Sequence, residues 1–316
     1  MKTNPLCNLL GIRYPILQGG MAWVSDASLA AAVSEGGGLG IISCIQGDLD
    51  DLRREIRKCR QLTDRPFGVN IMLMNPLAAD MAQLVREEHV PVVTTGAGMP
   101  TAYMNDWLHD GIHVIPVVAA SVIAMKMERI GACAVIAEGG ESGGHIGEMN
   151  TMALVPQICD AVKIPVIAAG GIADGRGLAA AWMLGAQGVQ CGTRFICAEE
   201  CTVHDVYKQK ILQAKDSDTI VTGKSLGHPV RALKTPFTRR FAEMEKDPAV
   251  TSDEILAFGS GSLRKAVRDG DAAMGSFMAG QSAGMVHQIQ PAATILREMF
   301  EQAEQIISSF ESWKTE

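Results

Sequence analysis

The chain has 316 residues, of which 47% are hydrophobic and 20% charged, and its formal net charge is −7 at pH 7. This length and composition fit one large α/β domain with an appendage, or two ordinary domains. The acidic balance gives no electrostatic reason to expect a nucleic-acid partner. No apolar run approaches the ~18–20 residues that cross a membrane, and the N-terminus lacks a secretory core. We therefore expect a cytoplasmic protein with reduced thiols.

Short apolar runs alternate with amphipathic stretches between residues 12 and 214. The apolar runs predict strands at 15–18, 39–43, 67–72, 90–94, 112–117, 133–137, 165–169 and 188–192. Most of them are continuously apolar, as in strands that are buried on both faces. The amphipathic stretches predict helices at 27–35, 49–61, 77–88, 101–110, 121–130, 151–162, 174–184 and 199–212. Asp26, Asp48, Asn75-Pro76 and Asp174 stand just before or at the expected helix starts, as N-cap chemistry favours. Eight alternating βα units predict an α/β fold, a (β/α)₈ TIM barrel of parallel strands.

The regular alternation ends near residue 214. Residues 215–272 contain three prolines, many charges and little periodicity, which indicates a smaller appended region, a partly helical lid with one short helix within 249–266. Residues 273–286, rich in glycine and methionine, lead into a closing helix at 292–310. Its apolar face is expected to pack on the body of the protein, because the opposite face is acidic rather than basic. The predicted domains are 1–214, 215–272 and 273–316.

Glycine and polar residues gather at the predicted carboxyl ends of the strands, where barrels of this type bind ligands. Gly170 and Gly171 follow the seventh strand, and Gly192 and Thr193 follow the eighth. A tight turn explains either pair alone. Two consecutive strand ends with exposed N–H groups and helix starts nearby favour a phosphate site.

A cluster of Cys197, Cys201 and His204 invites a metal interpretation. No fourth ligand is spaced to match, and the segment is expected to be helical. We therefore predict no metal site there.

The most informative stretch is residues 138–147, which read EGGESGGHIG after a buried strand. Glycines let the backbone approach a flat or anionic ligand closely. One imidazole, His145, stands near the end of the stretch. Taken alone, this histidine is either a catalytic residue or an ordinary loop residue. Another histidine, His228, precedes Pro229 in the appended region and is a weaker candidate for the same pocket.

The stretch 138–147 resembles the E-G-x-E-A-G-G-H-x-G signature of the flavin-dependent nitronate monooxygenase and enoyl-acyl carrier protein reductase II superfamily. Segments 14–21, 36–40, 67–70, 164–175, 188–195 and 278–282 resemble the same superfamily in the same order, over nearly the full length. The chain departs from the pattern at Ser142, where alanine is usual, and at Cys191, where valine is common. The motifs are specific for the FMN barrel and less specific for the reaction.

The resemblance implies FMN as cofactor. Its phosphate would lie on Gly170, Gly171, Gly192 and Thr193, and its ring over Gly20 and Met21, with Asn70 and Gln190 bonding the polar edge. Residues of 273–286, here called the returning segment, would close over the ring. They are Met278, Gly280, Gln281 and Ser282. The remaining residues implied to bind the cofactor are Glu138, Ser142, Gly143 and Ala169.

Within the superfamily we favour reduction of trans-2-enoyl-acyl carrier protein in fatty acid elongation, with NADH or NADPH as hydride donor. His145 would donate a hydrogen bond or a proton as general acid. The alternatives are a nitronate monooxygenase, which needs no pyridine nucleotide, and a non-catalytic flavin-binding protein. The resemblance implies that the appended region 215–272 binds substrate and NAD(P)H by shaping the tunnel for the acyl chain and the nicotinamide. Its basic residues either form an ordinary solvated surface or contact the acidic carrier or a cofactor phosphate. These residues are Lys224, Arg231, Lys234, Arg239 and Arg240. A homodimer fits the family, although no sequence patch indicates an interface.

Overall fold

The computed structural model describes residues 4–44 and 48–310 of the chain. Eight parallel strands form a nearly closed barrel in the order β1-β9-β8-β6-β5-β4-β3-β2. A bridge between Leu17 and Leu39 links β1 to the chain entering β2. The strands are β1 Ile16–Gln18, β2 Gly40–Ser43, β3 Phe67–Met72, β4 Val92–Gly96, β5 His113–Val118, β6 Val135–Glu138, β8 Val166–Ala169 and β9 Gly188–Cys191. The predicted (β/α)₈ barrel is thereby confirmed.

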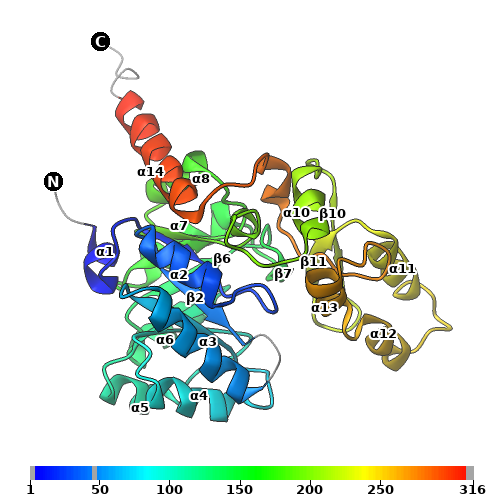
Figure 1. Ribbon diagram of the computed structural model, residues 1–316, viewed down its shortest axis with the longest axis horizontal. Coiled ribbons are helices and arrows are strands. Elements are labelled where there is room, and N and C mark those ends of the chain that lie inside the picture. Colours follow the sequence, from blue (N-terminus) through cyan, green and yellow to red (C-terminus); the bar gives the residue numbers. More distant parts are fainter. Residues whose placement is uncertain (1–3, 45–47, 311–316) are drawn as a thin grey trace.

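Helices surround the strands as the alternation predicted (Figure 1). They are α2 Ala27–Glu35, α3 Leu49–Leu62, α4 Ala78–Glu87, α5 Met104–His109, α6 Ser121–Arg129, α7 Thr151–Ala161 and α8 Gly175–Met183. The side chains of Asp26, Asp48 and Asp174 accept hydrogen bonds from the first turns of α2, α3 and α8, so these three N-caps are confirmed. Asn75 is not the N-cap of α4, because Leu77 holds that position and Asn75 Oδ1 accepts from Leu77 N at 2.9 Å in the turn before the helix.

The last helix of the barrel differs from the prediction. The expected helix at 199–212 was wrong in its first half, because α10 covers only Asp205–Leu212 and a short α9, Thr193–Ile196, follows β9 directly. His204 is the N-cap of α10, and its Nδ1 accepts from Val206 N at 3.2 Å. The intervening chain is instead tied to the returning segment by a bridge between Ala198 and Gln290.

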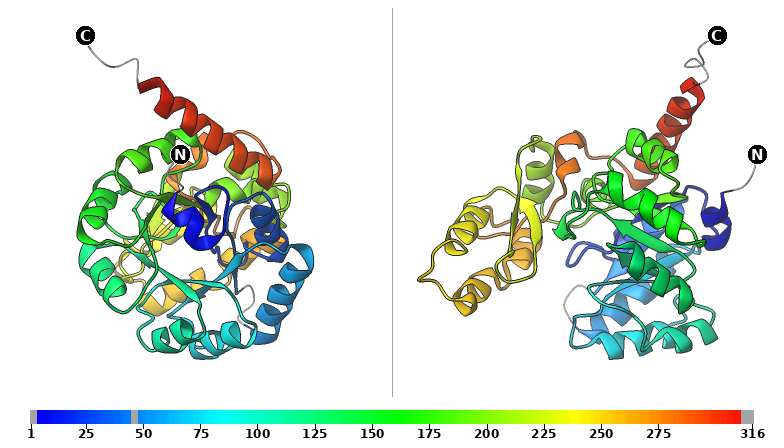
Figure 2. Two further views of the ribbon diagram at one scale, coloured as in Figure 1. Left: turned by 90° about the vertical axis from the view of Figure 1, so that its left-hand side faces the viewer. Right: turned by 180° about the vertical axis from the view of Figure 1, so that it is seen from behind.

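The amino end of the barrel is sealed by a helix that the periodicity did not predict, α1 Pro5–Leu10 (Figure 2). Asn4 caps it by accepting from the N–H groups of Leu6 and Cys7. Leu6 and Leu10 are buried in one cluster with the inward-facing side chains of the strands. Because this end is filled by side chains, a ligand cavity inside the barrel opens at the carboxyl end.

The appended region lies at that carboxyl end, on the side of the barrel opposite α1 (Figure 1). It contains β10 Thr219–Thr222, β11 Val230–Leu233, α11 Pro236–Met244, α12 Ser252–Gly259, α13 Ser262–Arg264 and a π-helical turn at Lys265–Asp269. One short helix was predicted here, so the regular structure was underestimated. Phe237, Phe241 and Ile255 form a small core that holds the helices together.

The region shares a sheet with the barrel loop after β6. The short strand β7 Gly144–His145 pairs with β11, which gives a three-stranded sheet in the order β10-β11-β7. The predicted boundaries between residues 214 and 215 and between 272 and 273 stay predictions. The outer ends of the predicted domains, residues 1–3 and 311–316, lie outside the described residues.

The chain returns through a 3₁₀ helix, Gln281–Met285, into the closing helix α14, Ala292–Ser309. Leu296 and Met299 are buried, so the apolar face packs on the body as expected, although Phe310 at its end is 38% exposed. Close packing on α8 requires Gly175, since a Cβ there would lie 2.5 Å from Met299 O. Among the described residues, no helix is long and apolar enough to cross a membrane.

Candidate active site at the carboxyl end of the barrel

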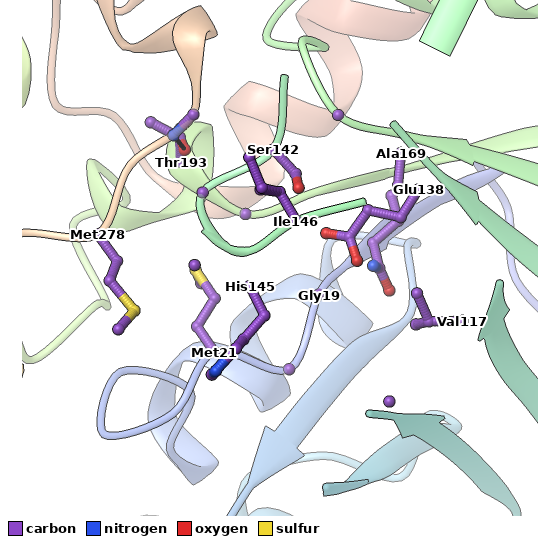
Figure 3. A pocket seen from close by; sticks show the side chains of 18 of the residues that line it. Gly19, Met21, Val117, Glu138, Ser142, His145, Ile146, Ala169, Thr193 and Met278 are labelled. Carbon is purple, nitrogen blue, oxygen red and sulfur yellow. Dashed lines mark hydrogen bonds between the residues drawn. The ribbon is translucent and has the colours of Figure 1, made fainter. Parts of the chain in front are cut away.

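A cavity of about 470 Å³ opens at the carboxyl end of the barrel strands. Side chains from separate strand ends and from the returning segment surround it, as Figure 3 shows for Met21, Glu138, His145, Thr193 and Met278. The predicted residues that line it are Gly20, Met21, Asn70, Glu138, Ser142, Gly143, His145, Ala169, Gly170, Gly171, Gln190, Gly192, Thr193, Met278, Gly280 and Ser282. The fold therefore brings into one place residues that are up to 262 positions apart in the chain.

Gln281 is the predicted cofactor residue that does not line this cavity. Its side chain is exposed, while its backbone N–H donates to Glu141 O at 2.9 Å. Its neighbours in the chain, Gly280 and Ser282, do line the cavity. Gln281 instead fixes the returning segment to the glycine-rich loop.

Sequence reasoning missed the far side of the cavity. Met72, Gly96, Ala97 and the stretch 117–119 line it at the ends of β3, β4 and β5. These residues carry no charge or polar motif, so no chemical signal marked them. Leu263 reaches the cavity from the appended region, where the sequence pattern was weakest.

The corner between β8 and β9 is built from backbone donors. Gly170 and Gly171 adopt φ angles of 96° and 75°, a left-handed conformation that favours glycine. Within the described residues, the N–H groups of Gly170, Gly171, Gly192 and Thr193 donate no hydrogen bond. Converging backbone donors beside helix starts suit a phosphate.

Thr193 also ties this corner to the returning segment, because its Oγ1 accepts from Gly280 N at 2.9 Å. The Tyr207 hydroxyl donates to Met278 O at 2.6 Å, which holds the next part of the same segment. Both hydrogen bonds keep Met278 and Gly280 over the cavity. The segment from 278 to 282 is therefore a fixed wall of the site.

The opposite wall combines a close backbone approach with an oriented amide. The Asn70 Oδ1 accepts from Thr94 Oγ1 at 2.9 Å, which leaves the Nδ2 donors free to face the cavity. A Cβ on Gly20 would overlap the Cβ of Asn70. The chain after β1 can therefore lie flat beside Asn70 only with glycine at position 20.

Glu138 ends β6 and projects its carboxyl group toward the cavity (Figure 3). Burial raises the pKa of Glu138 to about 7, and the nearby Ser142 hydroxyl acts in the opposite direction. At neutral pH the group is poised between a carboxylic acid, which donates a hydrogen bond, and a carboxylate, which only accepts.

His145 lies at the mouth of the cavity on β7 and is exposed on its outer side. Burial of its inner side, and to a smaller extent the charge of His228, hold the pKa of His145 below its ordinary value. The ring is therefore mainly neutral at pH 7, and a neutral imidazole can donate one hydrogen bond and accept another. The structure thus places His228 near His145, although His228 was the weaker of the two candidates from the sequence.

The site fits the group that the sequence motifs imply. A flat ring with a phosphate requires unpaired donors at one end, close backbone approach along one face and apolar walls at the other end, and the cavity offers all three. FMN is such a group. Among residues 4–44 and 48–310, no group of three or more His, Cys, Asp and Glu side chains comes together as a metal site requires.

Comparisons with known proteins agree with this geometry. The family described as nitronate monooxygenase matches residues 3–89 and 82–302. A structure of FabK from Thermotoga maritima has a TM-score of 0.96 and 51% identity, covering 99% of this chain and 100% of that chain.

Two curated proteins show the spread of names among the relatives. The (3aS,4S,5R,7aS)-5-hydroxy-7a-methyl-1-oxo-octahydro-1H-indene-4-carboxyl-CoA dehydrogenase of Mycobacterium tuberculosis is 42% identical over 240 residues, which cover 75% of this chain and 68% of that protein. The probable nitronate monooxygenase of Staphylococcus saprophyticus is 33% identical over 354 residues, covering 97% of this chain and 99% of that protein. With a family match over most of the chain and a relative matched end to end, the chain belongs to the nitronate monooxygenase family.

Proposed function

We propose that this chain is an FMN-dependent enoyl-acyl carrier protein reductase that uses NADH or NADPH. The observation that supports it most is the likeness to FabK, which extends over 99% of the chain at 51% identity and so includes the appended region beside His145. The likeness to the indene-4-carboxyl-CoA dehydrogenase of Mycobacterium tuberculosis spans 75% of the chain. Substrate selection depends on walls around the cavity, so similarity that includes those walls carries more weight than similarity of the barrel alone.

FMN, when bound, would supply hydride transfer between the pyridine nucleotide and the substrate. The backbone donors of Gly170, Gly171, Gly192 and Thr193 would hold its phosphate, and the amides of Asn70 and Gln190 would bond its polar edge. Negative charge that develops in such a site is stabilised by fixed donors that need no reorganisation. The Asn70 amide meets that condition because Thr94 already fixes its orientation.

His145 would act on the thioester. Addition of hydride to the β-carbon of an enoyl thioester places negative charge on the thioester oxygen, and the α-carbon then takes a proton. A neutral imidazole at the cavity mouth can donate its N–H to that oxygen. Its position next to solvent allows the proton to be replaced between turnovers. The ring's low pKa means that this donor is present at neutral pH without a positive charge.

The carrier protein is part of the proposal. Lys224, Lys234, Arg239 and Arg240 are exposed on the appended region. They suit contact with an acidic carrier whose pantetheine arm enters the cavity mouth. Arg231 does not belong to this surface, because its guanidinium is half-buried and bonded within the protein.

Nitronate oxidation is the second candidate, because a relative matched end to end carries that name. The same neutral His145 could accept a proton in that reaction. Two assays on one preparation separate the candidates. The reductase predicts NAD(P)H consumption that depends on crotonyl thioester. The monooxygenase predicts oxygen consumption with an alkyl nitronate and no need for pyridine nucleotide. Oxygen consumption with nitronate, together with no thioester-dependent NAD(P)H consumption, would overturn the reductase proposal, and turnover in neither assay would favour a non-catalytic flavin-binding protein.

A further inference from the structure

The loop that carries His145 has little rigidity of its own. Glycine occupies positions 139, 140, 143 and 144, and Gly144 has a φ of 78°. Glycine allows many backbone conformations, so a loop of this composition takes its shape from contacts with its surroundings. The position of His145 therefore depends on what holds the loop at either end.

The barrel holds the first end. Gly139 N donates to Ala169 O at 2.9 Å, and Gly140 N donates to Met149 O at 2.7 Å. The Glu141 carboxylate accepts from both the N–H and the hydroxyl of Thr151 at 2.9 Å, at the start of α7. These contacts fix residues 139–141, which lie four or more positions before His145.

The hairpin of β10 and β11 in the appended region holds the second end of the loop. In the antiparallel pair of β7 and β11, His145 lies opposite Val230 and Gly144 lies opposite Arg231. Ile146 N donates to Pro229 O at 3.1 Å, which extends the pairing by one residue. The backbone of His145 thus belongs to the sheet of the appended region rather than to the barrel.

Arg231 connects the two ends. Its backbone faces Gly144, while its Nε and Nη2 both donate to Gly140 O, at 3.1 and 2.9 Å. Its Nη1 donates to Thr219 Oγ1 at 3.2 Å, which orients the guanidinium from the neighbouring strand. The planar fork of arginine is suited to this two-donor contact, which the single ammonium of lysine cannot reproduce.

We propose that Arg231 is a positioning residue, which closes the turn from Gly140 to Gly144 and so holds the His145 ring at the cavity mouth. This inference rests on the proposed function for its kinetic consequence, because His145 is taken to act on the thioester. This role of Arg231 makes the appended region part of the catalytic arrangement and not only a cover over the cavity. Thr219 contributes through the orientation of the guanidinium.

The test compares Arg231→Met with Arg231→Lys and Thr219→Val in the flavin-loaded protein. Arg268→Met is the matched control, because Arg268 is exposed in the same region and the proposal gives it no role. In anaerobic stopped-flow experiments, Arg231→Met should slow reoxidation by crotonyl thioester by about ten- to a hundredfold, the range expected for a misplaced catalytic group. Arg231→Lys should recover only part of the rate, Thr219→Val should slow reoxidation less than Arg231→Met, and Arg268→Met should match the wild type.

A double mutant separates positioning from general damage. If Arg231 acts through His145, adding Arg231→Met to His145→Ala should slow reoxidation no further. Equal slowing in both backgrounds, or wild-type rates in Arg231→Met, would overturn the proposal.

Hydrogen exchange gives a readout that needs no turnover. The amides of residues 140–146 should exchange faster in Arg231→Met than in Arg268→Met. If crotonyl thioester fails to reoxidise even the wild type, the proposed function falls, and exchange then decides alone. Faster exchange at the loop supports the closing role of Arg231, and unchanged exchange overturns it.

Discussion

Replacing Glu138 by glutamine should remove a pH-dependent loss of stability. The carboxyl group stands at the end of β6 in the wall of the cavity, where the residue is partly buried. Burial raises its pKa from the ordinary 4.5 to about 7. A tenfold difference in proton affinity between the folded and unfolded states corresponds to about 1.36 kcal/mol, so the ionised carboxylate costs the folded protein about 3 kcal/mol relative to the unfolded chain. Glutamine has nearly the same shape and cannot ionise.

The direction in which stability changes with pH follows from proton binding to Glu138. Between pH 4.5 and about 7 the folded protein keeps the Glu138 proton while the unfolded chain has lost it. The stability contributed by this group is therefore fully present below pH 4.5 and is lost as the pH rises through about 7. Between about pH 5.5 and about pH 8.5 the wild type should lose about 2 kcal/mol more than Glu138→Gln.

Urea unfolding at both pH values, followed by circular dichroism, measures this difference. Glu243→Gln is the control, because the Glu243 side chain is 67% exposed in a surface pair with Arg240, and it should change stability by less than about 0.5 kcal/mol at either pH. If the wild type and Glu138→Gln lose stability in parallel between the two pH values, the carboxylate is solvated or paired in the folded protein. The reasoning from burial would then be wrong.

Two further substitutions test the wall of the site and the ion pairs between α3 and the end of α4. Gly20→Ala should weaken flavin binding by about tenfold or more, because the new Cβ overlaps Asn70 and moves its amide. Equilibrium dialysis measures the affinity, and an unchanged value would contradict the close approach at this position. Glu88→Gln should cost about 1–3 kcal/mol in urea unfolding, because its carboxylate, only 7% exposed, accepts from three arginines of α3 that are themselves partly solvated. A loss no larger than that of Glu243→Gln would show that these pairs add nothing.

The barrel could be predicted because each of its strands is locally marked. Runs such as 67–72 are continuously apolar and flanked by helical patterns, and burial on both faces leaves few alternatives. The carboxyl-end rule then gathers Gly20, Asn70, Gly170 and Gly192 into one site without any knowledge of distances. For that reason nearly all of the predicted residues line the cavity, whereas the orientation of Gln281 depends on a local turn that the motif does not specify.

The appended region was harder to predict because its structure depends on contacts distant in sequence. Strand β11 is only four residues long, Val230–Leu233, and one of its partners is the two-residue β7. Strands this short carry no readable period. The role of Arg231 follows from pairing between a loop at 144 and a hairpin at 231, and its residue type alone fits a solvated surface equally well. Helix α1 was not predicted for a related reason, since its six residues are too few to show a helical period.

The most direct test of the central claim is anaerobic reduction followed by reoxidation. The purified protein is reduced with NADH or NADPH without oxygen, and crotonyl thioester is then added to the wild type and to His145→Ala. The proposal predicts rapid reoxidation of the wild type by the thioester. It also predicts that His145→Ala is reduced at nearly the wild-type rate but is reoxidised about 10²–10⁴-fold more slowly, as for loss of an acid–base group. Rapid reduction of the wild type without reoxidation by the thioester would contradict the reductase proposal while leaving the flavin site intact.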